Sequence, residues 1–113
     1  MLNDSHGLDR TFQALADPVR RGMLARLAGG PASVSELARP LSISLPGVLQ
    51  HLKSLEECGL VRSEKKGRVR TVRLDAQNLS AAESWIVERR TEWEAQTDRF
   101  QTYVETLNSG ENR

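Results

Sequence analysis

Residues 44–74 read SLPGVLQHLKSLEECGLVRSEKKGRVRTVRL, and the apolar period changes halfway along this segment. In the first half, apolar residues recur at intervals of four and three, at Val48, Leu52 and Leu55, which is the spacing of one helical face. In the second half, two short valine-containing runs flank a Lys-Gly-Arg turn at residues 66–68. The segment therefore predicts an amphipathic helix followed directly by a β-hairpin.

Capping residues bracket the predicted helices. An Asp-Pro pair at residues 17–18 is typical of a helix start, because the carboxylate accepts from a free amide and proline needs no donor there. That helix is predicted to end at Gly29-Gly30. Residues 33–36, Ser-Val-Ser-Glu, have the pattern of a capping box and start a third helix. Ser44 and Gly59 bracket the fourth helix, which belongs to the opening segment.

The chain is predicted to form one domain over residues 8–107, with irregular polar ends. Residues 1–7 are predicted to be flexible and residues 108–113 to be frayed. A length of 113 residues allows one modest hydrophobic core, and a hydrophobic fraction of 38% favours further burial between two chains.

Apolar stripes run along the first and last predicted helices. Leu8, Phe12 and Leu15 share one face near the N-terminus. A second capping box at residues 80–83 is predicted to start a long helix over about residues 80–107. The stripe on that helix consists of Ile86, Trp93, Phe100 and Leu107, spaced by seven, with Tyr103 on the adjoining line. Leu79 extends the same spacing if the helix starts earlier. Packing between two such helices is the simplest use of these side chains, and a ligand pocket lined by the rings is the alternative.

The sequence predicts a protein of the cytoplasm. No apolar run approaches the roughly 20 residues that a membrane span requires, and residues 1–7 lack a basic region followed by an apolar run. Cys58 is the one cysteine, which excludes an intramolecular disulfide and fits a reducing compartment. Its position at a helix end predicts a small buried residue, with a redox role as the alternative.

Charge is distributed unevenly, although the formal net charge is only +1. Residues 44–74 carry seven lysines and arginines against three acids, a balance of +4. Residues 75–113 carry four arginines against eight acids, a balance of −4. The middle of the chain is therefore suited to face a polyanion. A chance unevenness of solvated charge is the alternative.

Four helices, a hairpin and a last helix, in that order, predict a winged helix-turn-helix, a mainly α fold with a small β-hairpin. In such a fold the helix after Ser44 would enter the major groove of double-stranded DNA. Gln50 can pair with adenine, and Leu45 and Leu49 can touch thymine methyl groups. The hairpin can hold phosphates. The candidate DNA contacts are Ser44, Leu45, Gly47, Leu49, Gln50, His51 and Lys53 on the helix and Lys66, Arg68 and Arg70 on the hairpin.

Four stretches resemble the ArsR/SmtB family of bacterial winged-helix regulators. They are LADPVRRGML at residues 15–24, VSELA at 34–38, SLPGVLQHL at 44–52 and LEECGLVR at 55–62. With the wing turn, the resemblance covers about residues 8–75. It implies a homodimer that pairs through its first and last helices, represses by binding an operator and releases the operator on a signal. The implied interface residues are Leu8, Phe12, Leu15, Ile86, Trp93, Phe100, Tyr103 and Leu107.

The chain departs from this family in three respects. Pro40 falls near the end of the third helix and predicts that this helix ends early. Leu45 and Leu49 replace positions that are often polar in the family, so the base preference is not transferred. The third helix lacks the cysteine pairs of metal-sensing members, and no histidine follows His51. We therefore expect neither a metal nor a cofactor, and the effector is unknown. We expect His51 to contact DNA, with a plain surface histidine as the alternative.

These observations support three functions to different degrees. The first hypothesis is a sequence-specific, homodimeric transcription regulator, a repressor that binds an inverted-repeat operator. The alternative is a winged helix that docks a protein partner through its last helix and does not read DNA; the positive charge of residues 44–74 argues against it. An enzyme ranks last, because no nucleophile–base pair, phosphate loop or carboxylate set is visible.

Overall fold

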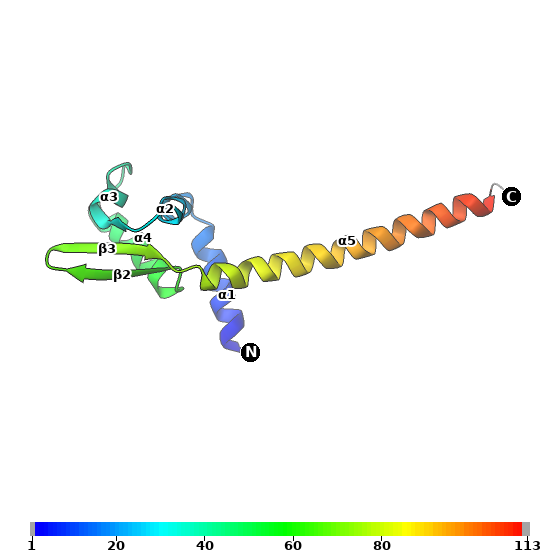
Figure 1. The fold of residues 1–113 in the computed structure, drawn as a ribbon, viewed down its shortest axis with the longest axis horizontal. Helices are drawn as coiled ribbons and strands as arrows, with labels where there is room; N and C mark the ends of the chain where they lie inside the picture. Colours follow the sequence, from blue (N-terminus) through cyan, green and yellow to red (C-terminus); the bar gives the residue numbers. More distant parts are fainter. Residues whose placement is uncertain (1, 112–113) are drawn as a thin grey trace. The chain divides into compact units, whose positions relative to one another are not determined.

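The computed structural model describes the backbone of residues 2–111 and the side chains of residues 7–110. Within this range, five helices and three strands follow one another (Figure 1). The helices are α1 (Leu2–Leu15), α2 (Pro18–Ala28), α3 (Val34–Ala38), α4 (Leu45–Glu57) and α5 (Gln77–Glu111). The strands are β1 (Ala32–Ser33), β2 (Val61–Lys66) and β3 (Val69–Leu74). The predicted fold class, a mainly α protein with a β-hairpin, is confirmed.

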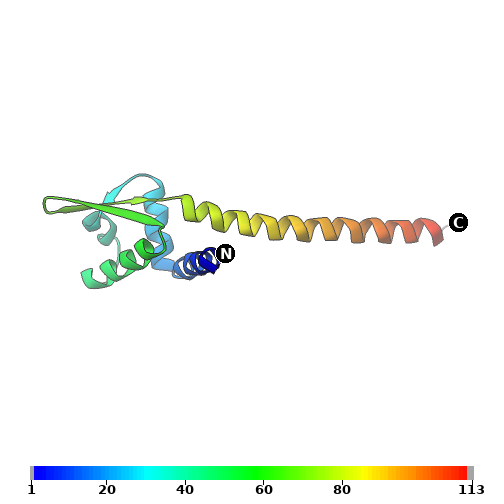
Figure 2. The same cartoon turned by 90° about the horizontal axis from the view of Figure 1, so that it is seen from below.

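The sheet has one strand more than the sequence predicted. Its order is β1-β3-β2, and both pairings are antiparallel. Strand β1 pairs Ala32 with Val72 and Ser33 with Thr71. A strand of two residues is too short to show an alternating pattern, so the sequence carried no signal for it. The end of the β2–β3 hairpin projects beyond α3 and α4 (Figures 1 and 2).

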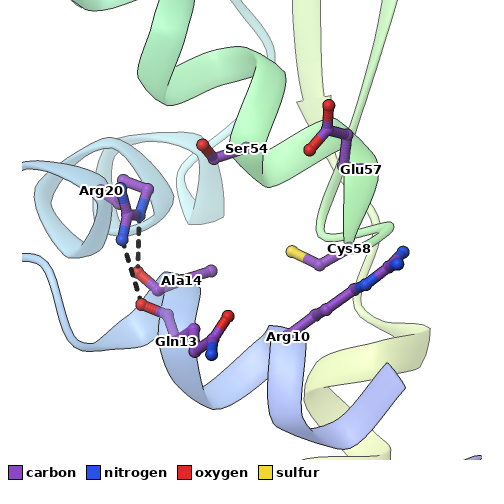
Figure 3. A pocket seen from close by; sticks show the side chains of 7 residues that line it. All are labelled: Arg10, Gln13, Ala14, Arg20, Ser54, Glu57 and Cys58. Atoms are coloured by element: carbon purple, nitrogen blue, oxygen red, sulfur yellow. Dashed lines mark hydrogen bonds between the residues drawn. The ribbon is translucent and has the colours of Figure 1, made fainter. Parts of the chain in front are cut away.

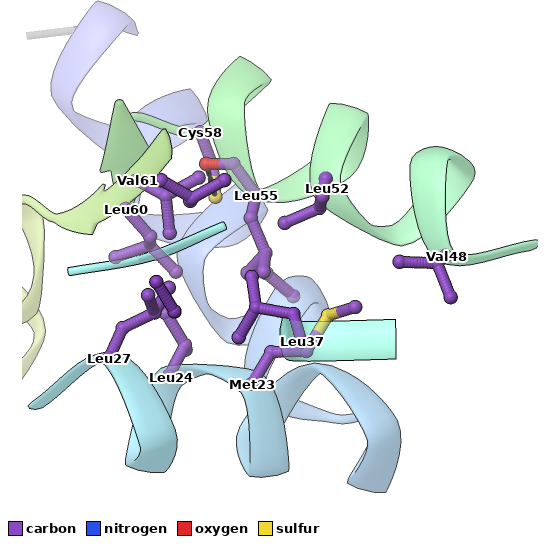
Figure 4. Close-up of a cluster of buried hydrophobic side chains, with 13 residues drawn as sticks. Met23, Leu24, Leu27, Leu37, Val48, Leu52, Leu55, Cys58, Leu60 and Val61 are labelled. Atoms are coloured by element: carbon purple, nitrogen blue, oxygen red, sulfur yellow. Dashed lines mark hydrogen bonds between the residues drawn. The ribbon is translucent and has the colours of Figure 1, made fainter. Parts of the chain in front are cut away.

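The chain divides into two units, Met1–Ala82 and Glu83–Arg113. The first unit contains the sheet, helices α1 to α4 and the first turns of α5, and the second contains the rest of α5. The hydrophobic core lies in the first unit, where side chains of α2 and α4 meet around Leu37 of α3 (Figure 4). Val48, Leu55 and Leu60 are fully buried. Burial of each such side chain contributes about 1.5–3 kcal/mol.

The capping residues hold α2, α3 and α4 as predicted. An Asp17 oxygen accepts from Arg20 N at 3.0 Å, and both hydrogen bonds of the Ser33–Glu36 capping box are present. Helix α3 ends at Ala38, before Pro40, which confirms the predicted early end.

Two helices extend beyond their predicted bounds. α1 begins at Leu2 rather than near Leu8, so residues 2–7, predicted to be flexible, are helical. α5 continues to Glu111 rather than ending near Leu107. No proline lies in either segment, and each residue added to an existing helix gains a backbone hydrogen bond. Met1 and residues 112–113, also predicted to be irregular, lie outside the described residues.

The predicted capping box at the start of α5 is wrong. Ser80 lies inside the helix, where its N–H and its hydroxyl both donate to Ala76 O, at 2.9 and 3.1 Å. The helix begins earlier because Asp75 Oδ1 accepts from Gln77 N at 3.1 Å. Packing supports the early start, since Leu79 contacts the core and Ala82 is buried.

Candidate nucleic-acid interface

Helix α4 turns one face to the core and the other to solvent. Its N-cap Ser44 accepts from Gly47 N at 3.3 Å, and Pro46 occupies the first turn, where no donor is needed. Three apolar residues of the helix are buried. Of the seven predicted contacts on and beside this helix, Ser44, Leu45, Leu49, Gln50 and Lys53 are exposed, whereas Gly47 and His51 are half-buried.

Helix α3 supports α4 in the helix-turn-helix. It is only five residues long, but Leu37 is buried in the same core as the inner face of α4. After it the chain makes a tight turn, in which Leu41 N donates to Ala38 O at 2.9 Å. Helix α3 therefore ends before Pro40, and the short segment between α3 and Ser44 sets the position of the first turn of α4.

The β2–β3 hairpin forms the wing, defined here as residues 61–74. The two strands are joined by Gly67 and Arg68, and Gly67 has a φ of 63°. A glycine with positive φ at the first position of a two-residue loop matches the right-handed twist of the strands. The tight loop brings the cations of both strands together at the end of the hairpin, where Lys66, Arg68 and Arg70 are exposed.

Like charges face each other across the wing. Lys65 lies directly opposite Arg70, and such a pair is destabilising in an isolated sheet. The other like-charged pair, Arg62 opposite Arg73, is relieved by Asp75, whose Oδ2 lies 2.8 Å from Arg62 Nε. Neither Lys65 nor Arg70 forms an ion pair or side-chain hydrogen bond with any described residue. An external anion at the wing would offset this repulsion.

A groove lies between the wing and α4, the second helix of the helix-turn-helix, which is called the recognition helix. Its volume is about 450 Å³, and it is bounded by the start of α3, the first turns of α4 and the end of the wing. The lining residues are Ser33, Val34, Ser35, Leu45, Leu49, Lys65, Arg68, Val69 and Arg70. The structure thus unites two surfaces that the sequence could only treat separately, an apolar helix face and a basic hairpin.

His51 lies away from this groove, against the start of α2. Its Nδ1 is 3.3 Å from Arg20 Nη1 and 3.8 Å from Asp17 Oδ2. Arg20 is held in place, because its Nε and Nη2 donate to the carbonyl oxygens of Ala14 and Gln13, both at 3.0 Å. The Arg20 N–H at the helix start is the main cause that lowers the pKa of Asp17 below its ordinary 3.8, with His51 adding to the effect. A DNA contact by His51 remains a prediction, and only its other ring nitrogen is left for one.

Several groove residues escaped the sequence prediction. Lys65 belongs to the basic cluster around Gly67 that the sequence shows, but the predicted contacts did not include it; the strand register places it opposite Arg70. Ser33, Val34 and Ser35 form the third wall of the groove because β1 pairs with β3, and nothing in a single sequence signals that pairing.

The predicted interface residues lie on α1 and α5. On α1, Thr11 and Ala14 are buried, and Leu15, a predicted interface residue, packs against the core of its own domain. Leu8 and Phe12 are half-buried. On α5, the five predicted residues are exposed large hydrophobic side chains, with Trp93 at 65% and Phe100 at 68%. Exposed apolar surface of this extent is typical of an interaction site.

The described residues show neither a metal-site cluster nor a membrane-spanning helix. No three side chains of histidine, cysteine, aspartate or glutamate gather there as a metal site would require. None of the helices in the described part of the chain combines the length and the apolar character needed to cross a membrane.

Comparison with known proteins identifies the family. A family model described as a helix-turn-helix domain matches residues 15–64. Over 73 residues the chain is 49% identical to the HTH-type transcriptional regulator Rv2034 of Mycobacterium tuberculosis, covering 65% of this chain and 68% of that protein. It is 28% identical over 80 residues to the transcriptional repressor SdpR of Bacillus subtilis, covering 71% and 89%. The crystal structure of an ArsR family transcriptional regulator, 44% identical, matches with a TM-score of 0.74 over 83% of this chain and 94% of that one. With its capped recognition helix and its wing, the chain belongs to the ArsR/SmtB family of winged helix-turn-helix transcriptional regulators.

Proposed function

We propose that this protein is a sequence-specific DNA-binding repressor. The observation that carries the proposal is the groove between α4 and the wing, which combines apolar side chains with cations that have no acidic partner among the described residues. Duplex DNA offers the matching chemistry, because base edges and methyl groups line the major groove and phosphates line its rims. The name of SdpR, a transcriptional repressor, supports repression rather than activation.

Helix α4 and the wing take different roles in this proposal. Gln50 hydrogen-bonds adenine through its amide, and Leu45 and Leu49 contact thymine methyl groups. Their exposure at the start of α4 supports this assignment. The wing supplies sequence-independent affinity, with Arg68 at its turn contacting a phosphate or entering the minor groove. Lys53, Lys66 and Arg70 add phosphate contacts, and Ser44 and Gly47 allow the helix start to approach the DNA backbone.

The repressor acts as a homodimer in this proposal. The exposed stripe on α5 supports self-association, because Trp93, Phe100 and Tyr103 would otherwise stay in water. The half-buried Leu8 and Phe12 of α1 extend the proposed interface. Two-fold symmetry of the dimer predicts an inverted-repeat operator with half-sites about one helical turn apart. The protein would act in the cytoplasm, without enzymatic activity, metal or cofactor.

The experiment that tests the proposal is the selection of bound duplexes from a random DNA pool by the purified protein. We expect enrichment of an inverted repeat with half-sites one turn apart. Gln50→Ala should relax the preference at one base pair of each half-site and cost about 1–3 kcal/mol of binding free energy. Binding without any sequence preference, lost as salt rises, would contradict base reading and favour the alternative, a winged helix that docks a protein partner through α5.

A further inference from the structure

Two flanks of α4 carry predicted DNA contacts, and only one of them borders the groove. Leu45 and Leu49, spaced by four, line the groove beside the wing. Gly47 and His51, also spaced by four, are offset from that pair by two residues, which places them on the opposite flank of the helix. There the His51 side chain is 22% exposed and lies against the start of α2. The flank of α4 remote from the wing therefore has a polar group of its own.

The guanidinium of Arg20 is fixed by other contacts before it reaches His51. Its Nε and Nη2 donate to Ala14 O and Gln13 O at the end of α1, both at 3.0 Å (Figure 3). Its Nη1 is then left 3.3 Å from His51 Nδ1. Arg20 thus connects the end of α1 and the start of α2 to the middle of α4, beside a cavity of about 480 Å³ that all three helices line.

This contact decides which ring nitrogen of His51 carries the proton. A guanidinium has N–H donors and no acceptor, so Nδ1 accepts with its lone pair and the proton of the neutral ring lies on Nε2. The nearby Asp17 Oδ2 already accepts from Arg20 N and lies 3.8 Å from Nδ1, beyond hydrogen-bond distance. A charged ring would attract Asp17, but it would also place two cations 3.3 Å apart. The geometry therefore fits the neutral ring.

We propose that Arg20 is a positioning residue, which keeps the proton of His51 on Nε2, and that this N–H donates to a phosphate of DNA. The phosphate contact rests on the proposed function. A helix in the major groove has phosphates along both flanks, and the wing borders only one flank of α4. His51 serves the other flank. Because a neutral donor releases no counterion, it adds affinity without adding to the salt dependence, unlike lysine or arginine.

The tautomer is tested on the full chain without DNA, by long-range ¹H–¹⁵N NMR of the imidazole at about pH 7.5, where an unperturbed ring is neutral. His51→Gln identifies the signals of His51 among those of the two histidines. We expect Nδ1 to be unprotonated and Nε2 to be protonated. Arg20→Gln should shift these signals toward a mixture of tautomers. Arg21→Gln is the matched control, because Arg21 donates to Leu15 O at 2.8 Å, also at the end of α1, but does not contact His51.

Two results of the NMR experiment would overturn the positioning role. One is a proton on Nδ1, either alone or together with a proton on Nε2. The other is an Arg20→Gln spectrum in which the His51 signals are those of the parent. The parent spectrum and the two His51 variants described next test the proposal even if Arg20→Gln does not fold.

The phosphate contact is tested on the duplex selected from the random pool. His51→Asn, which has no donor at the Nε2 position, should weaken binding to all duplexes about tenfold and leave the slope of log K against log salt unchanged. His51→Gln, whose amide N–H lies near that position, should recover part of the loss. Arg20→Gln should weaken binding by the parent but not further by His51→Asn, because its effect passes through His51.

Each part of the proposal can fail separately. If His51→Asn binds like the parent, or lowers the salt slope by about one as loss of a charged contact would, the neutral phosphate contact is wrong. If Arg20→Gln weakens His51→Asn as much as the parent, Arg20 does not act through His51. Absence of duplex binding by the parent would instead refute the proposed function and with it the phosphate contact, whereas the NMR spectrum decides the positioning role by itself.

Discussion

The junction between α4 and the wing depends on Gly59, and Gly59→Ala tests how. Gly59 has a φ of 74°, in the region that disfavours every residue with a Cβ. A Cβ at this position would also clash with Nδ2 of Asn78. That amide donates to Cys58 O at 2.6 Å and so connects the first turn of α5 to the end of α4. The substitution therefore strains the backbone and displaces a hydrogen bond at the same time.

The expected cost follows from these two effects. A residue with a Cβ is destabilised by about 1–2 kcal/mol in the left-handed conformation, and loss of the hydrogen bond lowers the free energy of unfolding by about 1 kcal/mol. Gly59→Ala should therefore lower the free energy of unfolding by roughly 2–3 kcal/mol, and Tm by roughly 10 °C. Gly67→Ala is the matched control, because Gly67 has a φ of 63° but a Cβ there meets nothing within 4 Å. It should lose only the backbone part.

A double-mutant cycle measured by urea unfolding separates the two contributions. Protein concentration is held constant throughout, because the proposed dimerisation would contribute to apparent stability. In the Asn78→Ala background, where the hydrogen bond is already absent, Gly59→Ala should cost about 1 kcal/mol less than in the parent. If Gly59→Ala and Gly67→Ala destabilise equally, or if the cycle shows no coupling between residues 59 and 78, the proposed role of the Asn78 contact is wrong.

Three further predictions concern the wing, the proposed dimer and pH. Arg68→Ala should weaken binding to all duplexes alike and reduce the slope of log K against log salt by about one, whereas an unchanged slope would exclude a phosphate contact at the wing turn. Trp93→Ala should weaken self-association in sedimentation equilibrium by about 30-fold or more, the loss typical of an aromatic hot spot. Thr91→Ala, on the same helix but off the stripe, should leave self-association unchanged. If both substitutions weaken self-association equally, the apolar stripe of α5 is not the dimer interface. The Gln77 N–H and then the Arg62 side chain hold the pKa of Asp75 below its ordinary 3.8, so its contribution to stability is present above about pH 4 and is lost as pH falls through the lowered folded-state value. Asp75→Asn should therefore make the fall of unfolding free energy at acid pH shallower. Asp98→Asn is the control, because the Asp98 carboxylate has no partner among the described residues. If Asp75→Asn and the parent lose stability identically at acid pH, Asp75 does not stabilise the fold through its carboxylate.

The starts of α2, α3 and α4, which local capping specifies, were predicted correctly, whereas the start of α5 was not. Asp17, Ser33 and Ser44 bind amides only a few residues away, so their sequence neighbourhood contains the whole interaction. The start of α5 is different, because a plausible capping box at Ser80 lost to an earlier start at which Leu79 contacts the core. The sequence offers two helix starts there, one at Ser80 and one after Asp75, and packing of Leu79 against the core stabilises the earlier one.

The candidate DNA contacts divide in the same way. The amphipathic pattern of α4 and the glycine turn of the wing predicted which residues face outward, because a helix period and a hairpin loop are local properties. His51 shares that pattern, yet its ring lies against Asp17 and Arg20, which are more than thirty positions away in the sequence. Sequence periodicity gives the direction of a side chain from its own helix and contains nothing about the neighbouring helix.

By itself, the sequence determined the order of the elements, the capped recognition helix, the basic wing and the membership of a regulator family. Each of these depends on residues close together in the chain or on a motif that can be compared directly. Only the tertiary structure decided that β1 joins the sheet, that helix and wing share one groove and that residues of α1, α2 and α4 line a common cavity (Figure 3). These features are contacts between distant segments, and their geometry exists only after the core has fixed the elements against one another.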